Sequence, residues 1–437
     1  MNTPNQTADG NPHSVSNGST DAAPATLSNM PRATARLQFH RDFTLDDAVD
    51  VVDYYHALGI SHLYASPILT AKMGSTHGYD IADPTRVNPE LGGEAALKRL
   101  VAKLRSVGMG LIVDIVPNHM SAGPENPWWQ DVFEFGADSR YAAWFDIDWL
   151  PSDTALKGKI LAPYLGQPYG EALRSGDLTL QRDDENGKLY LHYFSHRFPL
   201  APYTYADVLR GGDQQQDLAR YACSSEEGVQ AMHELLERQH YRLTWWRNAA
   251  EEINWRRFFE VSDLAGVRVE QEDVFDAVHE HVFRMYAQGL IDGVRVDHVD
   301  GLAQPAAYCL RLRQRLTELS ASRPQGVPRD QPYIVLEKIL ESDEQLRDDW
   351  QVDGTTGYDF MNQAGALLHA PDGAAALTAM WQSITGDTDD FATHVKLARA
   401  QLLEQNFVGE LDSLSRYLLA LAREDMATRD FSLAAIR

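Results

Sequence analysis

Short apolar runs alternate with longer helix-like segments along residues 35–116 and again along residues 272–337, and this alternation limits the fold more than any other feature. The short runs are rich in Ile, Leu and Val, and the longer segments carry apolar residues at helical spacing. Segments that alternate in this way favour a parallel sheet whose strands are joined through helices. The expected strands are 35–39, 60–66, 111–116, 290–296 and 332–337, and the expected helices are 43–58, 93–107, 272–288 and 303–319.

The predicted fold class is therefore α/β, of the (β/α)8 TIM-barrel type. A closed barrel of this type needs eight strands, whereas five are counted, so an incomplete barrel is expected. The irregular stretch after the third strand is too long for a connecting loop and predicts an inserted subdomain. Within it, residues 188–194 are expected to form a β-like patch, and helices are expected near 226–250. The expected organisation is a disordered leader at 1–30, a first part of the barrel at 31–118, the insertion at 119–272, the continuation of the barrel at 273–365, and a helical region at 366–437 that begins a further subdomain.

The charge balance limits the partners of the chain. There are 39 basic and 63 acidic residues, which gives a net charge of −24. Such a surface repels phosphate backbones and anionic lipids, so neither nucleic acid nor membrane is an expected partner. No apolar run reaches the roughly 18 residues that a membrane helix needs. Cys223 and Cys309 lie far apart and in no metal-ligand spacing, which favours a reducing compartment and a cytoplasmic location.

Two of the expected strands end in carboxylates. In the segment 293–300 (GVRVDHVD), Arg295 and Asp297 are two positions apart, so their side chains project from the same face of a strand. Arg295 is expected to lower the pKa of Asp297 and to keep it ionised. The following strand ends in Glu337. Two carboxylates about 5 Å apart at neighbouring strand ends suit retaining glycoside chemistry; the alternative is that each is a charge that caps a loop.

A third polar cluster follows the strand at 111–116. Asp114 shares a face of that strand with Ile112 and Val116, and Asn118 and His119 come directly after it. We interpret these three polar side chains as contacts to sugar hydroxyls. The alternative is a purely structural histidine.

The segment 74–80 (GSTHGYD) brings a histidine and a tyrosine between turn-forming glycines. The ring of Tyr79 can stack on the apolar face of a pyranose while His77 and Asp80 bind its hydroxyls. An ordinary glycine loop is the alternative. Aromatic pairs in the insertion are interpreted singly as core and together as a candidate cleft wall; they are Trp128-Trp129, Trp144-Phe145 and Trp245-Trp246.

Three of these segments resemble conserved regions of the α-amylase superfamily: DIVPNH at 114–119, VRVDH at 294–298, and Glu337. Further motifs resemble the maltooligosyl trehalose synthase family and cover about residues 31–365. EKIL together with GTTGYDF is specific to that family and its near relatives, whereas DxxxNH alone indicates only the superfamily. The motifs are SPI at 66–68, the segment 74–80, NPELGG at 88–93, INWRRFF at 253–259, DHVDGL at 297–302, EKIL at 337–340 and GTTGYDF at 354–360.

The resemblance implies an intramolecular transglucosylation. The reducing-end α-1,4 bond of a maltooligosaccharide would become an α,α-1,1 bond, giving maltooligosyl trehalose. In this interpretation Asp297 is the nucleophile and Glu337 the acid and base, while Arg295 and His119 orient the nucleophile and the bound ring above Tyr79. The other implied substrate-binding residues are Asn118, Asp114, His77, Asp80 and His298. No cofactor and no metal are expected, and a maltooligosyl trehalose trehalohydrolase would act next on the product.

One feature of the superfamily is not matched. Its members use a third carboxylate at the end of the seventh strand, and nothing after Glu337 resembles it, since Asp359 belongs to a different motif. The chain as given is therefore expected to be inactive by itself. A retaining α-glucan hydrolase and an inactive glucan-binding fragment are the two alternatives.

Overall fold

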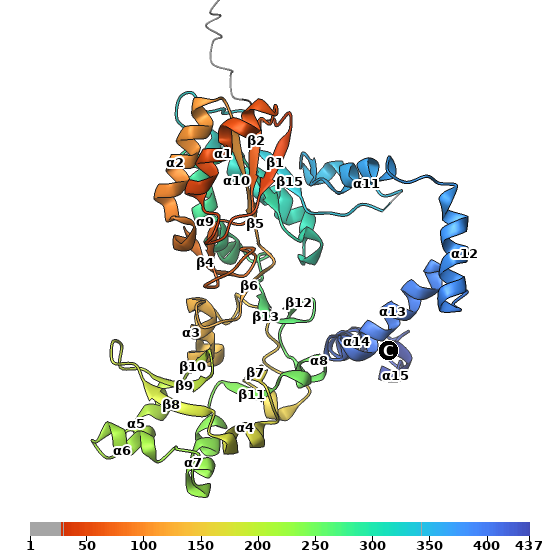
Figure 1. The fold of residues 1–437 in the computed structure, drawn as a ribbon. Helices are drawn as coiled ribbons and strands as arrows, with labels where there is room; N and C mark the ends of the chain where they lie inside the picture. Colours follow the sequence, from red (N-terminus) through yellow and green to blue (C-terminus); the bar gives the residue numbers. More distant parts are fainter. Residues whose placement is uncertain (1–27, 29, 342) are drawn as a thin grey trace, which may run out of the picture.

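The computed structural model describes residues 28, 30–341 and 343–437, so nearly all of the predicted leader at 1–30 lies outside the described residues. The central sheet has six parallel strands in the order β1-β2-β5-β14-β15-β16 (Figure 1). This order follows the chain, as in a (β/α) barrel that is partly wound. The strands are β1 (Thr34–Leu37), β2 (His62–Ala65), β5 (Gly110–Ile115), β14 (Gly293–Val296), β15 (Tyr333–Leu336) and β16 (Gly354–Thr355).

Helices cover the outer face of this sheet, and their sequences explain why. α1 (Leu45–Ala57) begins at Thr44, which forms a reciprocal capping box with Asp47. α2 (Gly93–Ser106) buries an apolar stripe at helical spacing, made of Ala96, Leu97, Leu100, Val101 and Leu104. α9 (Glu272–Ala287) and α10 (Pro305–Ser320) precede and follow β14. Every residue of β5 is buried, as expected for a central strand covered on both faces.

The sheet has one strand more than the five predicted. In β16, Gly354 pairs in parallel with Val335, and Thr355 pairs with Leu336. The strand is two residues long and contains no Val or Ile. It therefore lacks the apolar run by which a strand is predicted from sequence. Its pairing brings Thr356 and Tyr358 next to the carboxyl end of β15, where Glu337 lies.

The insertion leaves the barrel through β6 (His119–Ser121) and returns through β13 (Val261–Gly266), and these two strands pair antiparallel. β13 also pairs with β12 (Arg257–Phe258). Farther out, β7 (Ile160–Leu165) pairs in parallel with β11 (Tyr241–Trp245). A separate antiparallel sheet is formed by β8 (Leu178–Arg182), β9 (Leu189–Tyr193) and β10 (His196–Pro199). The β-like patch expected at 188–194 is confirmed as β9.

The prediction of helices near 226–250 is partly wrong. α7 (Glu226–Leu236) is helical, but residues 241–245 form β11, and α8 (Ala249–Glu252) is a single turn. Tyr241 and Leu243 are buried, whereas Arg242 between them is partly exposed, and this period of two is that of a strand. The pairing with β7, about 80 residues earlier in the chain, selects the strand over the helix.

The aromatic pairs behave mostly as core. Trp129 is fully buried and packs edge-on against Phe133, Phe145 and Trp255. Trp128 packs against Trp144. In the third pair, Trp246 is exposed.

The sequence predicts helices at 360–384 and 389–426, and both stretches are confirmed as helical, although each is divided into two helices. They are α11 (Tyr358–Ala366), α12 (Gly373–Thr385), α13 (Phe391–Gln405) and α14 (Val408–Ala422), followed by α15 (Leu433–Ile436). The chain leaves the sheet at α11 and returns to the insertion at α14, beside α8 (Figure 1). There Glu410 of α14 binds the buried guanidinium of Arg257 at 2.7 Å. None of the helices in the described ranges is long and apolar enough to span a membrane.

Candidate active site

A cavity of about 650 Å³ lies at the carboxyl ends of the central strands, the edge where (β/α) barrels carry their active sites. Residues from the sheet, from the loop before β4 (Ile81–Val87) and from the β12–β13 region of the insertion form its wall. The lining residues are Arg36, Tyr64, His77, Tyr79, His119, Phe258, Val261, Leu264, Arg295, Asp297, Glu337, Thr356 and Tyr358.

Arg295 is the common partner of three carboxylates from three adjacent strands. Its Nη1 lies 2.8 Å from Oδ1 of Asp114 and 2.7 Å from Oδ1 of Asp297, and its Nη2 lies 3.2 Å from Oε1 of Glu337. The sheet register explains this arrangement, since Arg295 lies directly beside Asp114 on β5 and beside Val335 on β15. The predicted convergence of Arg295, Asp297 and Glu337 is confirmed.

The expectation that the pKa of Asp297 is lowered and that Asp297 stays ionised is wrong. Burial, followed by the negative charge of Asp114, raises the pKa of Asp297 to about 8, and Glu337 adds to the shift. Arg295 lowers this pKa but is outweighed, because its single positive charge is shared among three carboxylates. The local sequence shows the arginine next to Asp297, but it shows neither the burial of Asp297 nor the nearby charge of Asp114.

Glu337 has the opposite shift. Burial raises its pKa, but Arg295, the backbone N–H of His298 and a hydrogen bond from the Asp297 carboxyl together bring it below its ordinary value. The His298 N–H donates to Oε2 at 2.9 Å, and the Tyr358 hydroxyl donates to Oε1 at 3.1 Å. Asp297 and Glu337 thus contact the two Nη atoms of the same guanidinium, and the pKa of Asp297 is raised while that of Glu337 is lowered. Two carboxyl groups held by one guanidinium suit the short separation of a retaining pair.

Asp114 lies beneath the cavity and does not line it. Its side chain is fully buried, and Oδ2 accepts hydrogen bonds of 2.8 Å from both Tyr64 and Tyr79. The Tyr79 hydroxyl accepts a hydrogen bond of 2.9 Å from Arg36. Because these partners engage both carboxylate oxygens, Asp114 fixes Arg295 and the two tyrosines in place.

His119 lies in the cavity wall. Its Nε2 is buried and has no hydrogen-bond partner of ordinary geometry among the described residues, although the backbone of Tyr79 also acts on the ring. Burial and the positive charges of His298 and Arg256 lower its pKa to about 3, so the ring is neutral at physiological pH. Its Nδ1 lies 3.3 Å from the amide nitrogen of Asn118.

Arg256 determines which atom of Asn118 faces the histidine. Its Nη1 donates to Oδ1 of Asn118 at 2.7 Å, so the amide nitrogen of Asn118 points to His119 and donates to Nδ1. The ring proton of His119 therefore resides on Nε2. Arg256 is itself held by Asp146 at 3.0 Å.

The other residues singled out from the sequence divide into two groups. His77 and Tyr79 line the cavity with their rings stacked, 5.9 Å between centroids. Asp80 accepts a hydrogen bond from Ser75 and holds the loop, and the ring of His298 packs against Phe258 at 5.0 Å. Like Asn118, neither of these lines the cavity.

Sequence reasoning missed several lining residues. Arg36 and Tyr64 are polar side chains at positions of apolar strands that the register places side by side, and this is a signal that could have found them. Phe258 and Tyr358 stand inside motifs that were recognised, but only the structure places them in the cavity wall.

Comparison with known proteins agrees with this geometry. The model of the alpha amylase catalytic domain matches residues 31–211. A putative maltooligosyl trehalose synthase of Mycobacterium tuberculosis (strain ATCC 25618 / H37Rv) is 40% identical over 405 residues, which are 90% of this chain and 45% of that protein. The chain thus spans about half the length of the curated relatives it matches.

Solved structures give the same result. Maltooligosyltrehalose synthase from Arthrobacter ramosus aligns with a TM-score of 0.74 and 36% identity, over 89% of this chain and 45% of that one. A structure described as DSM5389 glycosyltrehalose synthase aligns with a TM-score of 0.75 and 33% identity, over 93% and 52%. The chain is therefore similar to the alpha amylase catalytic domain over residues 31–211 and to maltooligosyl trehalose synthases over most of its length.

Proposed function

We propose that these residues form the active site of a (1→4)-α-D-glucan 1-α-D-glucosylmutase, which converts maltooligosaccharides to maltooligosyl trehalose. The observation that carries the proposal is that Asp297 and Glu337, at the ends of neighbouring strands, both contact the guanidinium of Arg295. Two carboxyl groups this close suit a retaining double displacement. The similarity to maltooligosyl trehalose synthases over 90% of the chain supports the choice of reaction.

In the first step, Asp297 attacks the anomeric carbon of the penultimate glucosyl unit. The bond to O4 of the reducing-end glucose breaks, and Glu337 gives its proton to that oxygen. In the free site the pKa of Asp297 is raised and that of Glu337 is lowered, so glucan binding must reverse this order and leave the proton on Glu337. Nε2–H of His119 is the donor we assign to a hydroxyl of the ring beside Asp297.

In the second step, the released glucose turns within the cavity. Its anomeric hydroxyl attacks the same carbon, its proton passes to Glu337, and the bond to Asp297 breaks. Water would give hydrolysis at this point, so the glucose must be retained and water excluded. Thr356 and Tyr358 lie beside Glu337 in the cavity wall, and we assign them to the side of the cavity that holds the glucose.

Product analysis with maltopentaose tests the proposal. We expect reducing ends to disappear without release of glucose, and a product of unchanged mass. The 437-residue chain is assayed beside a chimera that continues with the remaining length of the Mycobacterium relative. Glucose release with a gain of reducing ends would instead indicate a retaining hydrolase, and binding without turnover by both proteins would indicate a glucan-binding module.

A variant assigns the reaction to this site. Asp297→Asn in the active protein should abolish turnover, because a neutral amide cannot attack the anomeric carbon while its shape preserves packing. Near-normal activity of Asp297→Asn would remove this residue from the role of nucleophile.

Three further proposals accompany this function. A maltooligosyl trehalose trehalohydrolase would consume the product, and a coupled assay releasing trehalose tests this. We propose a cytoplasmic location, which cell fractionation tests. We also propose that 31–118 and 273–365 form one catalytic unit, with 119–272 inserted into it and 366–437 beginning another; limited proteolysis at these boundaries is the test.

A further inference from the structure

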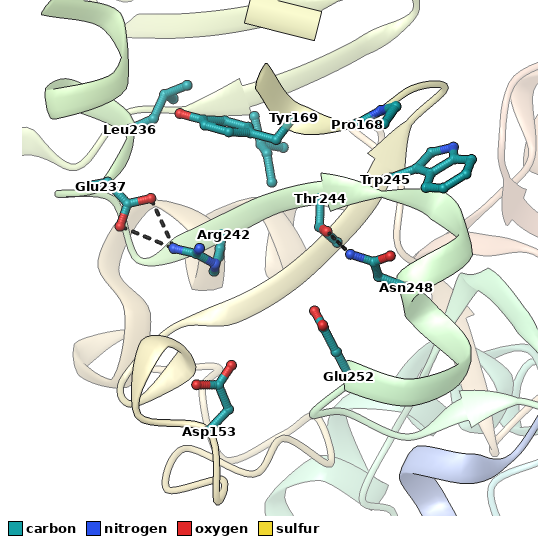
Figure 2. Close-up of a pocket in the computed structure, with 11 residues that line it drawn as sticks. Asp153, Pro168, Tyr169, Leu236, Glu237, Arg242, Thr244, Trp245, Asn248 and Glu252 are labelled. Atoms are coloured by element: carbon teal, nitrogen blue, oxygen red, sulfur yellow. Dashed lines mark hydrogen bonds and ion pairs between the residues drawn. The ribbon is translucent and has the colours of Figure 1, made fainter. Parts of the chain in front are cut away.

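A second cavity, of about 320 Å³, lies in the insertion and shares no lining residue with the active-site cavity. It is formed around β11, between α4 (Tyr169–Ser175), the end of α7 and α8 (Figure 2). These elements lie in the outer part of the insertion, away from the strand ends that carry Asp297 and Glu337 (Figure 1). The volume is at the lower end of the roughly 300–1,000 Å³ typical of small-molecule sites.

One side of this cavity is an aromatic wall. The ring of Tyr169 extends along it, with Pro168 and Trp245 beside it (Figure 2). The Tyr169 hydroxyl hydrogen-bonds to Nδ1 of His233 at 3.0 Å, and His233 is not part of the lining. Because its polar end is engaged elsewhere, Tyr169 offers the cavity the carbon face of its ring.

The opposite side is polar, and part of it has no partner. Asp153 and Glu252 lie there (Figure 2), and Glu252 has no hydrogen-bond or ion-pair partner within the described part of the chain. Asp153 uses Oδ1 to accept the N–H of Ala155 at 2.9 Å, which leaves Oδ2 free. Arg242 is paired with Glu237 at 3.0 and 3.1 Å, so the two acidic side chains remain without a cation of their own.

Asn248 completes the polar side. One hydrogen of its amide goes to the Thr244 hydroxyl at 2.8 Å, which leaves a second N–H and the carbonyl oxygen for a ligand. The cavity therefore offers carboxylate acceptors and an amide along one side, and an aromatic face along the other.

We propose that this cavity is a second carbohydrate site, which binds a glucosyl unit of an α-1,4-glucan at a distance from the catalytic carboxylates. A pyranose has an apolar face of C–H groups and an edge of hydroxyl donors, and these match the Tyr169 wall and the Asp153–Glu252 wall. An anion would be repelled by the two carboxylates. No group of three or more His, Cys, Asp or Glu among the described residues is arranged to hold a metal ion. The choice of glucan among neutral polyols rests on the proposed function.

A second carbohydrate site would increase the affinity of the protein for long glucans. A glucan held in the insertion raises the local concentration of chain ends near the molecule. Affinity should therefore increase from maltotriose to amylose more steeply than one cavity alone would produce.

Calorimetric titration of the full 437-residue chain with maltotriose tests the proposal. We expect two binding events per chain. Glu252→Gln removes no hydrogen bond, and it should weaken one event about tenfold, since a charged acceptor of sugar hydroxyls is lost. Tyr169→Ala should weaken the same event by at least as much. The matched control is Glu251→Gln, which changes the neighbouring residue of α8 outside the cavity and should leave both events unchanged.

A variant in the active-site cavity identifies the other binding event. His119→Ala should weaken the other event and leave the one sensitive to Glu252→Gln intact. A single event that is unaffected by both Glu252→Gln and Tyr169→Ala would overturn the proposal. A titration in which the diamine putrescine binds at Glu252 while maltotriose does not would also overturn it. Neither result depends on turnover, so failure of this site and failure of the proposed mutase activity are distinguishable.

Discussion

The raised pKa of Asp297 makes a prediction about stability that needs no substrate. Asp297 is 5% exposed, and burial beside Asp114 and Glu337 raises the pKa of its carboxyl group to about 8. In the unfolded chain its pKa is about 3.9. Below pH 4 both states carry the proton, and between about pH 4 and pH 8 the folded state holds one proton more. Stability from this group is therefore fully present at low pH and is lost as the pH rises through about 8.

The size of the effect follows from the same linkage. One extra proton in the folded state lowers the free energy of unfolding by about 1.4 kcal/mol per pH unit across this window. Asp297→Asn removes the titrating group and keeps its shape. The variant should therefore lose less stability than the unmodified protein between pH 5 and pH 8, and should be the more stable of the two at pH 8.

Urea unfolding at pH 5, 6, 7 and 8 measures both slopes. Asp50→Asn is the control, because Asp50 is an exposed carboxylate on α1 and its replacement should leave the slope unchanged. Equal pH slopes for the unmodified protein and Asp297→Asn would refute the argument that three carboxylates share the charge of one arginine.

Three other predictions concern single contacts. In Asn118→Asp, the new carboxylate accepts from His119, so the ring proton should move from Nε2 to Nδ1; nitrogen-15 chemical shifts of His119 report this, and unchanged shifts would contradict the role of Arg256. Glu337→Gln in the active protein should accumulate a glycosyl-enzyme with an activated glucosyl fluoride, which needs no proton to leave; absence of the adduct in mass spectrometry would count against the acid/base role. Glu410→Gln removes the charge paired with buried Arg257, and removal of one partner from a buried ion pair costs about 3–5 kcal/mol. The variant should therefore expose α14 to protease, and an unchanged cleavage pattern would show that apolar packing alone holds α14.

Most strands of the barrel and the three central charged residues of the site could be predicted from the sequence. Arg295, Asp297 and Glu337 could be predicted because the side chains of a strand alternate and because parallel strands end at one edge of a sheet. β16 could not be predicted, because a strand of two residues is too short to show an alternation of apolar and polar side chains. The local spacing around β11 predicts a helix, because the pairing of β11 with β7 is a tertiary effect that local spacing does not contain.

The electrostatics of the site were the least accessible to sequence reasoning. The pKa of Asp297 depends on Asp114, which is 183 positions away in the chain, and on a burial that only the folded sheet produces. Likewise, nothing in the sequence around His119 indicates that Arg256 sets its tautomer. Such contacts arise between segments that pair only when the whole unit has folded.

The antiparallel pairing of β6 with β13 also bears on the order in which the protein folds. Asp114 and Arg295 are 181 positions apart, and bringing such distant strands together is entropically costly. If the insertion folds first and pairs Ser121 with Leu264, the loop that β5 and β14 must close shrinks to about 40 residues. The closure cost then falls by about 1.4 kcal/mol, or roughly tenfold in probability. The insertion would thus act as a folding nucleus for the barrel that contains it, and β14 would find β5 only after β13 has found β6.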